Sequence, residues 1–192
     1  MNQIKELAEL LVSSIIEKYN SESRLLIAID GRCASGKTTL SAELQKILLC
    51  NVIHMDQFFL RPEQRSEYRL ALPGENVDHE RFLSEVLIPL TKGEEFAYSP
   101  FDCKTMMLRE KINIGIKRIN IIEGSYSCHN SLFNYYDLRI FLDVSKTEQI
   151  RRILLRDGSE QLKMFETKWI PLEEMYFKEF DIANRCDYIF TT

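Results

Sequence analysis

Eight consecutive residues near the start of the chain, GRCASGKT from Gly31 to Thr38, could bind the phosphates of a nucleotide. They match the pattern G-x-x-x-x-G-K-[ST], in which glycines let backbone N–H groups point at phosphate oxygens. Lys37 would bridge the β- and γ-phosphates, and the Thr38 hydroxyl would hold Mg²⁺. The sequence therefore predicts a site for ATP with Mg²⁺, formed by Gly31, Ala34, Ser35, Gly36, Lys37, Thr38 and Thr39.

Carboxylates near apolar segments could serve the same chemistry. Asp56 follows the apolar segment 51–55, where it could accept the proton of an attacking hydroxyl or cap a turn. Glu123 follows the apolar segment 118–122, so it is either a ligand of Mg²⁺ through water or a solvated charge at a strand end. Asp30 directly precedes the glycine loop and could assist Mg²⁺ or shape the turn.

A basic segment, 146–156, carries Arg151, Arg152 and Arg156. Such a cluster is usually a solvated helix face. Guanidinium groups also neutralise the charge that spreads over the oxygens of a transferring phosphoryl group, so the residues alone leave both interpretations open. With Lys37 and Asp56, Arg152 and Arg156 are therefore candidate catalytic residues.

Short aliphatic runs alternate along the chain with apolar residues at helical spacing. The alternation predicts a doubly wound, mostly parallel α/β sheet, and the aliphatic runs indicate that helices cover both of its faces. Strands are expected at 24–29, 51–55, 118–122, 138–144 and 187–190. Helices are expected at 2–19, 37–49, 79–90, 146–156 and 160–180, with Pro171 marking a break or restart.

Two further stretches stand outside this alternation. Short strands at 96–98 and 111–114 would form a small side hairpin. The polar segment 57–78 has no clear period, and a loop of that length in a compact domain is usually functional. Because ligands of such sheets bind beyond the carboxyl ends of the strands, the glycine loop, Asp56, Glu123 and the region of Asp143 should meet at one edge.

The composition is that of an ordinary globular protein, with 192 residues of which 45% are hydrophobic and 28% charged. This length suits a single domain, 1–192. A net charge of −4 argues against a nucleic-acid binder, and no apolar run reaches the length of a membrane span. The five cysteines form no C-x-x-C pair and the N-terminus has no signal-peptide core, so a cytoplasmic location is expected.

Six segments, taken in order, make the chain similar to a known family. They are the glycine loop with the strand before it, HMDQFF at 54–59, NVDHERF at 76–82, YSPFD at 98–102, IIEG at 121–124, and FLD at 141–143 with the arginines that follow. Together they resemble the uridine kinase branch of the P-loop kinases, which is related to phosphoribulokinase and bacterial pantothenate kinase. The resemblance extends from about Leu25 to Phe190.

This resemblance implies ATP- and Mg²⁺-dependent phosphorylation of the 5′-hydroxyl of uridine or cytidine. It also implies that Asp56 is the base and binds the hydroxyl, that Asp78 binds the ribose, and that Arg152 and Arg156 belong to a short lid. Asp78 could instead cap the helix that follows, and both roles could coexist. The expected partner is a small-molecule substrate, and a homo-oligomer is possible because the family is often oligomeric.

Two departures from the family concern the acceptor and the lid. The family's hairpin supplies a tyrosine and a histidine to the pyrimidine, and Phe101 and Met106 stand at those positions. Phe101 keeps a ring, but Met106 cannot donate a strong hydrogen bond. After Gly158 the family's R-G-R-D stretch is missing, and the segment that replaces it contains Trp169, which could cover the pocket or pack in the core.

The identity of the acceptor therefore stays open at this point. A kinase for another small alcohol would use the same chemistry. A nucleoside monophosphate would need extra cations, for which Arg61, Arg65 and Arg109 are available, and Arg61 is also a candidate substrate contact. The donor could be ATP or GTP. A nucleotide-binding module without catalysis is a third hypothesis, against which Asp56 argues because a pure binder needs no base.

Overall fold

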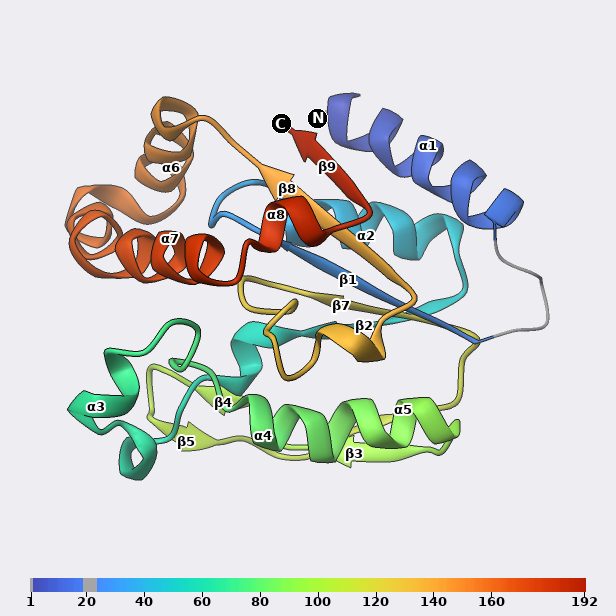
Figure 1. The fold of residues 1–192 in the computed structure, drawn as a ribbon, viewed down its shortest axis with the longest axis horizontal. Coiled ribbons are helices and arrows are strands. Elements are labelled where there is room, and N and C mark those ends of the chain that lie inside the picture. The colour runs from blue at the N-terminus through green and yellow to red at the C-terminus, as the bar shows by residue number, and fades with distance from the viewer. Residues whose placement is uncertain (1, 19–23) are drawn as a thin grey trace.

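Five parallel strands form the centre of the computed structural model, which describes residues 2–18 and 24–192 (Figure 1). Their order across the sheet is β2-β7-β1-β8-β9, and every neighbouring pair is parallel. The parallel sheet with its flanking helices confirms the predicted fold class. The strands are β1 (Leu25–Gly31), β2 (Cys50–His54), β7 (Ile119–Glu123), β8 (Leu138–Asp143) and β9 (Tyr188–Thr191).

Helices cover both faces of this sheet, so every residue of β1 and of β7 is buried. Because side chains alternate along a strand, Leu26 and Ala28 of β1 contribute to one apolar core, while Ile27 and Ile29 contribute to the other. The first core includes residues of α4 (His79–Phe82), α5 (Ile88–Lys92), α7 (Ile170–Glu179) and α8 (Ile182–Arg185), and the second includes residues of α1 (Asn2–Lys18) and α2 (Lys37–Ile47). Residue 19, the last of the first predicted helix, lies outside the described residues.

Two prolines are each the second residue of a helix that follows a widened turn. Pro89 in α5 follows the π-helical turn Leu83–Leu87, and Pro171 in α7 follows the π-helical turn Phe165–Trp169. Proline has no N–H and its ring clashes with the carbonyl four residues earlier, which favours a wider turn ahead of it. The break or restart expected at Pro171 is thus a π-helical turn through which the helical path continues.

Helix α6 (Lys146–Met164) leads into the second of these turns and bends at Gly158, where φ is 82° and ψ is 173°. Glycine adopts positive φ at little cost, so the sequence permits a bend here. The bend separates the two helical segments that the sequence predicts, 146–156 and 160–180.

The segments between β2 and β7 form the lower part of the view in Figure 1. Segment 57–78, expected to lack regular structure, contains a 3₁₀ turn at Pro62–Gln64 and the short helix α3 (Glu67–Leu70). The predicted side hairpin is present, with β3 (Phe96–Tyr98) antiparallel to β6 (Ile112–Ile114) and β4 (Phe101–Asp102) antiparallel to β5 (Met107–Leu108). Within residues 2–18 and 24–192, no helix combines the length and the apolar character needed to cross a bilayer.

Candidate active site

A cavity of about 1040 Å³ lies at the carboxyl edge of the sheet. The loop after β1, Asp56 after β2 and Glu123 at the end of β7 all line it, as the strand order requires. The predicted site residues along its wall are Ala34, Gly36, Lys37, Thr38, Thr39, Asp56, Met106, Glu123, Arg152 and Arg156. The predicted residues Gly31, Ser35, Arg61, Asp78 and Phe101 do not line it.

The glycine loop adopts backbone angles that few residues tolerate. Gly31 has a φ of 133°, and a Cβ there would lie 2.0 Å from a backbone oxygen of β8. Gly36 is the N-cap of α2 with a φ of 98°, and Ala34 has a φ of 60°. The Lys37 ammonium donates to the carbonyl oxygens of Gly31 at 2.6 Å and Arg32 at 2.8 Å. This loop at the N-terminus of α2 has the form of a phosphate-binding nest.

Two neighbouring acids of helix α7, Glu173 and Glu174, contact the same loop and its surroundings. Neither was among the predicted site residues. Glu173 accepts the backbone N–H of Cys33 at 2.9 Å and the hydroxyl of Ser125 at 2.7 Å. Glu174 pairs with the guanidinium of Arg32 at 2.6 Å, and Arg32 also pairs with Asp143 at the end of β8. No local sequence signal joins these residues, because α7 and the loop are about 140 positions apart.

Glu123 is buried, and its carboxylate contacts the side chains of Thr38 and His54. Its carboxylate oxygens lie 3.2 and 3.3 Å from the hydroxyl of Thr38, and one of them lies 2.5 Å from Nδ1 of His54. This hydrogen bond with Glu123 is the main reason that the pKa of His54 is raised. A hydroxyl and a carboxylate side by side are hard oxygen donors, so this pair fits a Mg²⁺ ion that keeps several waters. The sequence analysis assigned no role to His54, although it pairs with Glu123 in the β2–β7 register.

Asp56 lies in the 3₁₀ turn Met55–Phe58 and is exposed to the cavity. The pKa of Asp56 is raised, first because the surrounding protein limits the hydration of its carboxylate and second because Glu123 is nearby. His54 and Lys37 act in the opposite direction. A carboxylate with a raised pKa is a stronger proton acceptor than an ordinary aspartate, which suits general-base chemistry.

Asp78 is 2% exposed and caps α4, where its carboxylate accepts the N–H of Arg81 at 3.1 Å. Its other oxygen accepts a hydrogen bond from the side chain of Gln64 at 2.9 Å. The structure thus has the capping role foreseen as the alternative, and Asp78 does not line the cavity. Each oxygen keeps a free lone pair, so a ribose contact stays a prediction.

The other acceptor-side predictions differ in where their side chains lie. Met106 lines the cavity with a φ of 57°, whereas Phe101 is buried in β4 under the guanidinium of Arg65. Arg61 and Arg109 lie outside the cavity and form ion pairs with Glu63 at 3.3 Å and Asp102 at 2.5 Å. Further residues that line the cavity include Phe59, Leu60, Arg65, Leu70, Asn76, Cys103, Lys168 and Trp169.

The bent helix α6 contributes three arginines to the opposite wall. Arg152 donates to the carbonyl of Ala34 in the glycine loop at 3.1 Å, and to Glu148 at 2.8 Å. Arg156 pairs with its neighbour Asp157 at 2.7 Å, and Arg151 pairs with Glu148 at 2.6 Å. All three therefore have acidic partners that they would share with, or exchange for, an anionic ligand.

Asp30 has a structural role, the second of the two foreseen for it. It is fully buried and accepts hydrogen bonds from the N–H groups of Gly31, Tyr126 and Cys128 and from the Tyr176 hydroxyl. Burial raises its pKa to about 6, against the effect of these donors. Asp30 thus fixes the loop after β7 and helix α7 to the end of β1, away from the cavity wall.

The chain resembles curated kinases over most of its length. It is 31% identical over 166 residues to a uridine kinase of Ureaplasma parvum serovar 3, and the aligned region covers 78% of each chain. It is 27% identical over 183 residues to uridine-cytidine kinase B of Dictyostelium discoideum, and the aligned region covers 90% of this chain and 72% of the other. No family model matches the sequence.

The fold has a close counterpart among solved structures. A structure described as a possible uridine kinase from Bacillus stearothermophilus superposes with a TM-score of 0.74 at 18% identity, covering 98% of this chain and 99% of the other. At that identity the likeness concerns the fold alone, and it agrees with the family that the curated relatives indicate. The P-loop, the parallel sheet and these relatives together establish that the chain is a kinase and belongs to the uridine kinase family of P-loop kinases.

Proposed function

We propose that the chain transfers the γ-phosphoryl group of ATP to the 5′-hydroxyl of uridine or cytidine, with residues 1–192 acting as one kinase domain. The observation that carries this proposal is that Lys37, Thr38, Glu123 and Asp56 line one cavity, so phosphate-binding groups and a proton acceptor face the same space. The names of the relatives, uridine kinase and uridine-cytidine kinase B, support this choice of acceptor.

The donor half of the cavity would hold ATP with Mg²⁺. The N–H groups of the glycine loop and the ammonium of Lys37 bind the phosphates, and Lys37 exchanges its contacts with loop carbonyls for phosphate oxygens. Thr38 and Glu123 hold Mg²⁺, directly or through water. The bound ion supplies charge neutralisation at the β- and γ-phosphate oxygens.

Asp56 would accept the proton of the acceptor hydroxyl as that oxygen bonds to the γ-phosphorus atom and the bond from this phosphorus to the oxygen of the departing ADP breaks. Its raised pKa strengthens it as a base, and His54 and Lys37 limit that rise. Arg152 and Arg156 would neutralise the charge that spreads over the phosphoryl oxygens, because they line the same cavity from the lid side. Such positioning and electrostatic stabilisation supply most of the catalysis in phosphoryl transfer.

We assign to the acceptor the part of the cavity that Phe59, Met106 and Trp169 line. The polar side chains in that part are Arg65, Asn76 and Lys168. The rings of Phe59 and Trp169 are 6.2 Å apart, and Met106 lies in the same wall. A flat base would stack on these side chains, and Asn76 is the neutral side chain able to read its polar edge. Recognition would then rely on stacking more than on hydrogen bonds, which predicts weak discrimination between uridine and cytidine.

A nucleoside monophosphate is a weaker candidate for the acceptor. Of the three arginines that could bind its phosphate, Arg65 alone lines the cavity, while Arg61 and Arg109 pair with acids elsewhere. Arg65 also donates to the carbonyl of Leu60 at 2.9 Å. Arg65, which already has a partner, and Lys168 make a weaker phosphate site than three arginines would.

The experiment is a coupled assay of ADP release with ATP and Mg²⁺ over a panel of acceptors. The panel contains uridine, cytidine, other nucleosides, nucleoside monophosphates, pantothenate and ribulose 5-phosphate. The proposal expects turnover with uridine and cytidine at similar kcat/KM. Turnover with another acceptor alone would replace the proposed substrate and keep the kinase mechanism, while ATP binding without turnover on any acceptor would contradict the proposal.

A further inference from the structure

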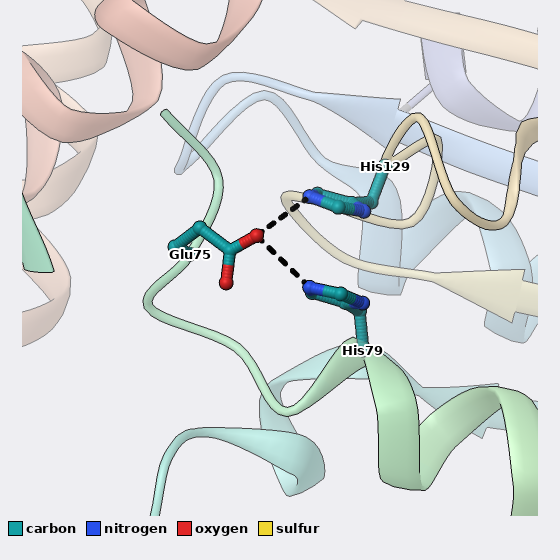
Figure 2. A group of neighbouring side chains, drawn as sticks. All are labelled: Glu75, His79 and His129. Carbon is teal, nitrogen blue, oxygen red and sulfur yellow. Dashed lines mark hydrogen bonds and ion pairs between the residues drawn. The ribbon is translucent and has the colours of Figure 1, made fainter. Parts of the chain in front are cut away.

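A second group of side chains, away from the active-site cavity, has the residue types of a metal site. It consists of Glu75 near the end of segment 57–78, His79 at the start of α4 and His129 in the loop after β7 (Figure 2). One potential ligand atom of each lies within 4.8 Å of the other two. None of the three lines the cavity, and the phosphoryl transfer proposed above does not use them.

Both histidines direct Nε2 toward the same oxygen of Glu75, as Figure 2 shows. His79 Nε2 lies 3.0 Å from Glu75 Oε1, a hydrogen bond, whereas His129 Nε2 lies 4.0 Å from it, which is too far for one. His129 is 3% exposed, and its Nε2 has no hydrogen-bond partner in the described structure. A buried polar atom without a partner needs an explanation, and a bound ion is one.

The charges around the cluster favour a cation. The second oxygen of Glu75 faces Arg69 at 3.1 Å, and Arg69 also pairs with Glu80 at 2.6 Å. Glu80 in turn lies 3.8 Å from His79 Nε2. Two carboxylates and one guanidinium leave one net negative charge when the histidines are neutral. Burial is the main reason that the pKa of His129 falls to about 3, so this ring is neutral at pH 7.

We propose that Glu75, His79 and His129 bind a Zn²⁺ ion. Imidazole nitrogens with one carboxylate suit Zn²⁺, whereas Mg²⁺ and Ca²⁺ prefer oxygen ligands throughout. Three protein ligands leave a fourth position, which water or Glu80 would fill. The ion ties segment 57–78 and α4 to the loop after β7, next to Asn76 and Tyr126 in the cavity wall. This inference does not depend on which acceptor the kinase uses.

Binding requires two local changes. The rings of His79 and His129 are stacked, with centroids 4.1 Å apart and planes at 15°, so their Nε2 lone pairs run side by side instead of converging. His129 is also stacked on Tyr176 at 6°, so the ring of His79 is the one that turns. Ser131 donates its N–H to His129 Nδ1 at 3.3 Å. Coordination through Nε2 moves the ring proton to Nδ1, so this long hydrogen bond is lost and the Ser131 N–H turns away from the ring.

The test is a titration of the EDTA-treated full chain with Co²⁺, followed by displacement with Zn²⁺, in excess Mg²⁺ that fills the active site. Co²⁺ substitutes for Zn²⁺ in such sites, and its visible absorption reports histidine ligands and low coordination number. The proposal expects one equivalent of Co²⁺ with intense visible bands, full displacement by Zn²⁺, and a higher unfolding temperature with Zn²⁺.

The variants are Glu75→Gln, His79→Asn and, as the matched control, Glu63→Gln, which removes an exposed carboxylate of the same segment outside both the cluster and the cavity. Loss of a group that only orients a metal ligand costs roughly 10–100-fold in metal affinity. The first two variants remove a ligand itself, so their affinity for Co²⁺ should fall by more than that, and the control should bind Co²⁺ as the unchanged chain does. Circular dichroism and ATP binding identify variants that fold, and either of the two variants alone is decisive. Absence of stoichiometric binding in the unchanged chain, or binding that survives both substitutions, would overturn the proposal.

Discussion

Glu123 contacts more of the polar groups at the base of the cavity than its neighbours Thr38 and His54 do. It meets the hydroxyl of Thr38 and the ring of His54, and its charge raises the pKa of both His54 and Asp56. The contact with His54 fixes the rotation of the carboxylate and leaves its other oxygen to the Mg²⁺ site proposed above. An oriented ligand binds a metal more tightly than a free one, because outer partners reduce the cost of ordering it.

Removing that support should weaken the binding of Mg²⁺. For His54→Ala we expect the Mg²⁺ concentration at half-maximal rate to rise by about tenfold, with a smaller change in the rate at saturating Mg²⁺. His54→Gln, which can still donate to Glu123, should recover part of the loss. The measurement is initial rate against Mg²⁺ concentration at fixed ATP. An unchanged Mg²⁺ dependence in both variants would remove His54 from the site.

The role of Asp78 could be predicted from the sequence only in part. The sequence supplies an aspartate before a helix, and the same two oxygens can cap that helix or bind a diol. The cap was foreseen as an alternative, whereas the hydrogen bond from Gln64 to the second oxygen was not, because the turn that holds Gln64 is too short to have a period. Arg61 and Arg109 are similar, because their positions follow from ion pairs with Glu63 and Asp102, and a sequence offers many such acids.

At the scale of elements, strands were predictable because each is an aliphatic run between polar segments. Their order in the sheet, β2-β7-β1-β8-β9, was not predicted, because no local pattern says which strands pair. The helical turns within 57–78 were also not predictable, since they are too short to have a period. Capping stabilises them instead, as in α3, where Ser66 accepts the N–H of Arg69. The contact of α7 with the glycine loop could not be predicted from the sequence either, because the two segments are 140 positions apart and come together only in the folded sheet.

The bend of α6 at Gly158 gives a test of how the lid is positioned. Both Gly158 and Gly115 have open space where a Cβ would be, but Gly158 alone of the two has positive φ, at 82°. We expect Gly158→Ala to lower the free energy of unfolding by about 1–2 kcal/mol or to straighten the helix and lower kcat, because alanine disfavours this conformation. Urea unfolding and steady-state kinetics measure the two effects.

Gly115→Ala is the matched control, since its backbone lies in a region open to any residue. It should change stability by less than about 1 kcal/mol and leave kcat unchanged. If both substitutions leave stability and kcat unchanged, the bend at Gly158 is not a fixed feature of the lid.

At the scale of the whole molecule, buried titratable groups link folding to pH in opposite directions. The pKa of Asp30 is raised to about 6 in the fold, so the folded state binds more protons between about pH 4 and 6, and this group's contribution to stability falls as pH rises there. The pKa of His129 is lowered to about 3. The unfolded state therefore binds more protons at this histidine below pH 6.5, and its contribution to stability rises with pH.

Comparison of the unchanged chain with His129→Phe separates the second effect, because Asp30 is common to both. Phenylalanine preserves the ring between His79 and Tyr176. Between pH 5 and 7, with EDTA present, the unfolding free energy of the unchanged chain should rise relative to that of the variant by about 2 kcal/mol. Urea unfolding at the two pH values gives this difference. A difference that does not change with pH would mean that His129 titrates alike in both states.

The most direct test of the central claim, that Asp56 activates the acceptor hydroxyl in a site that binds ATP independently, is single-turnover transfer of γ-³²P from ATP to uridine. The comparison is between the unchanged chain and Asp56→Asn, with ATP affinity measured on the same samples. Loss of a general base predicts a rate lower by about 10²–10⁴-fold with ATP affinity unchanged. Labelled uridine monophosphate formed at an undiminished rate by Asp56→Asn would contradict the account.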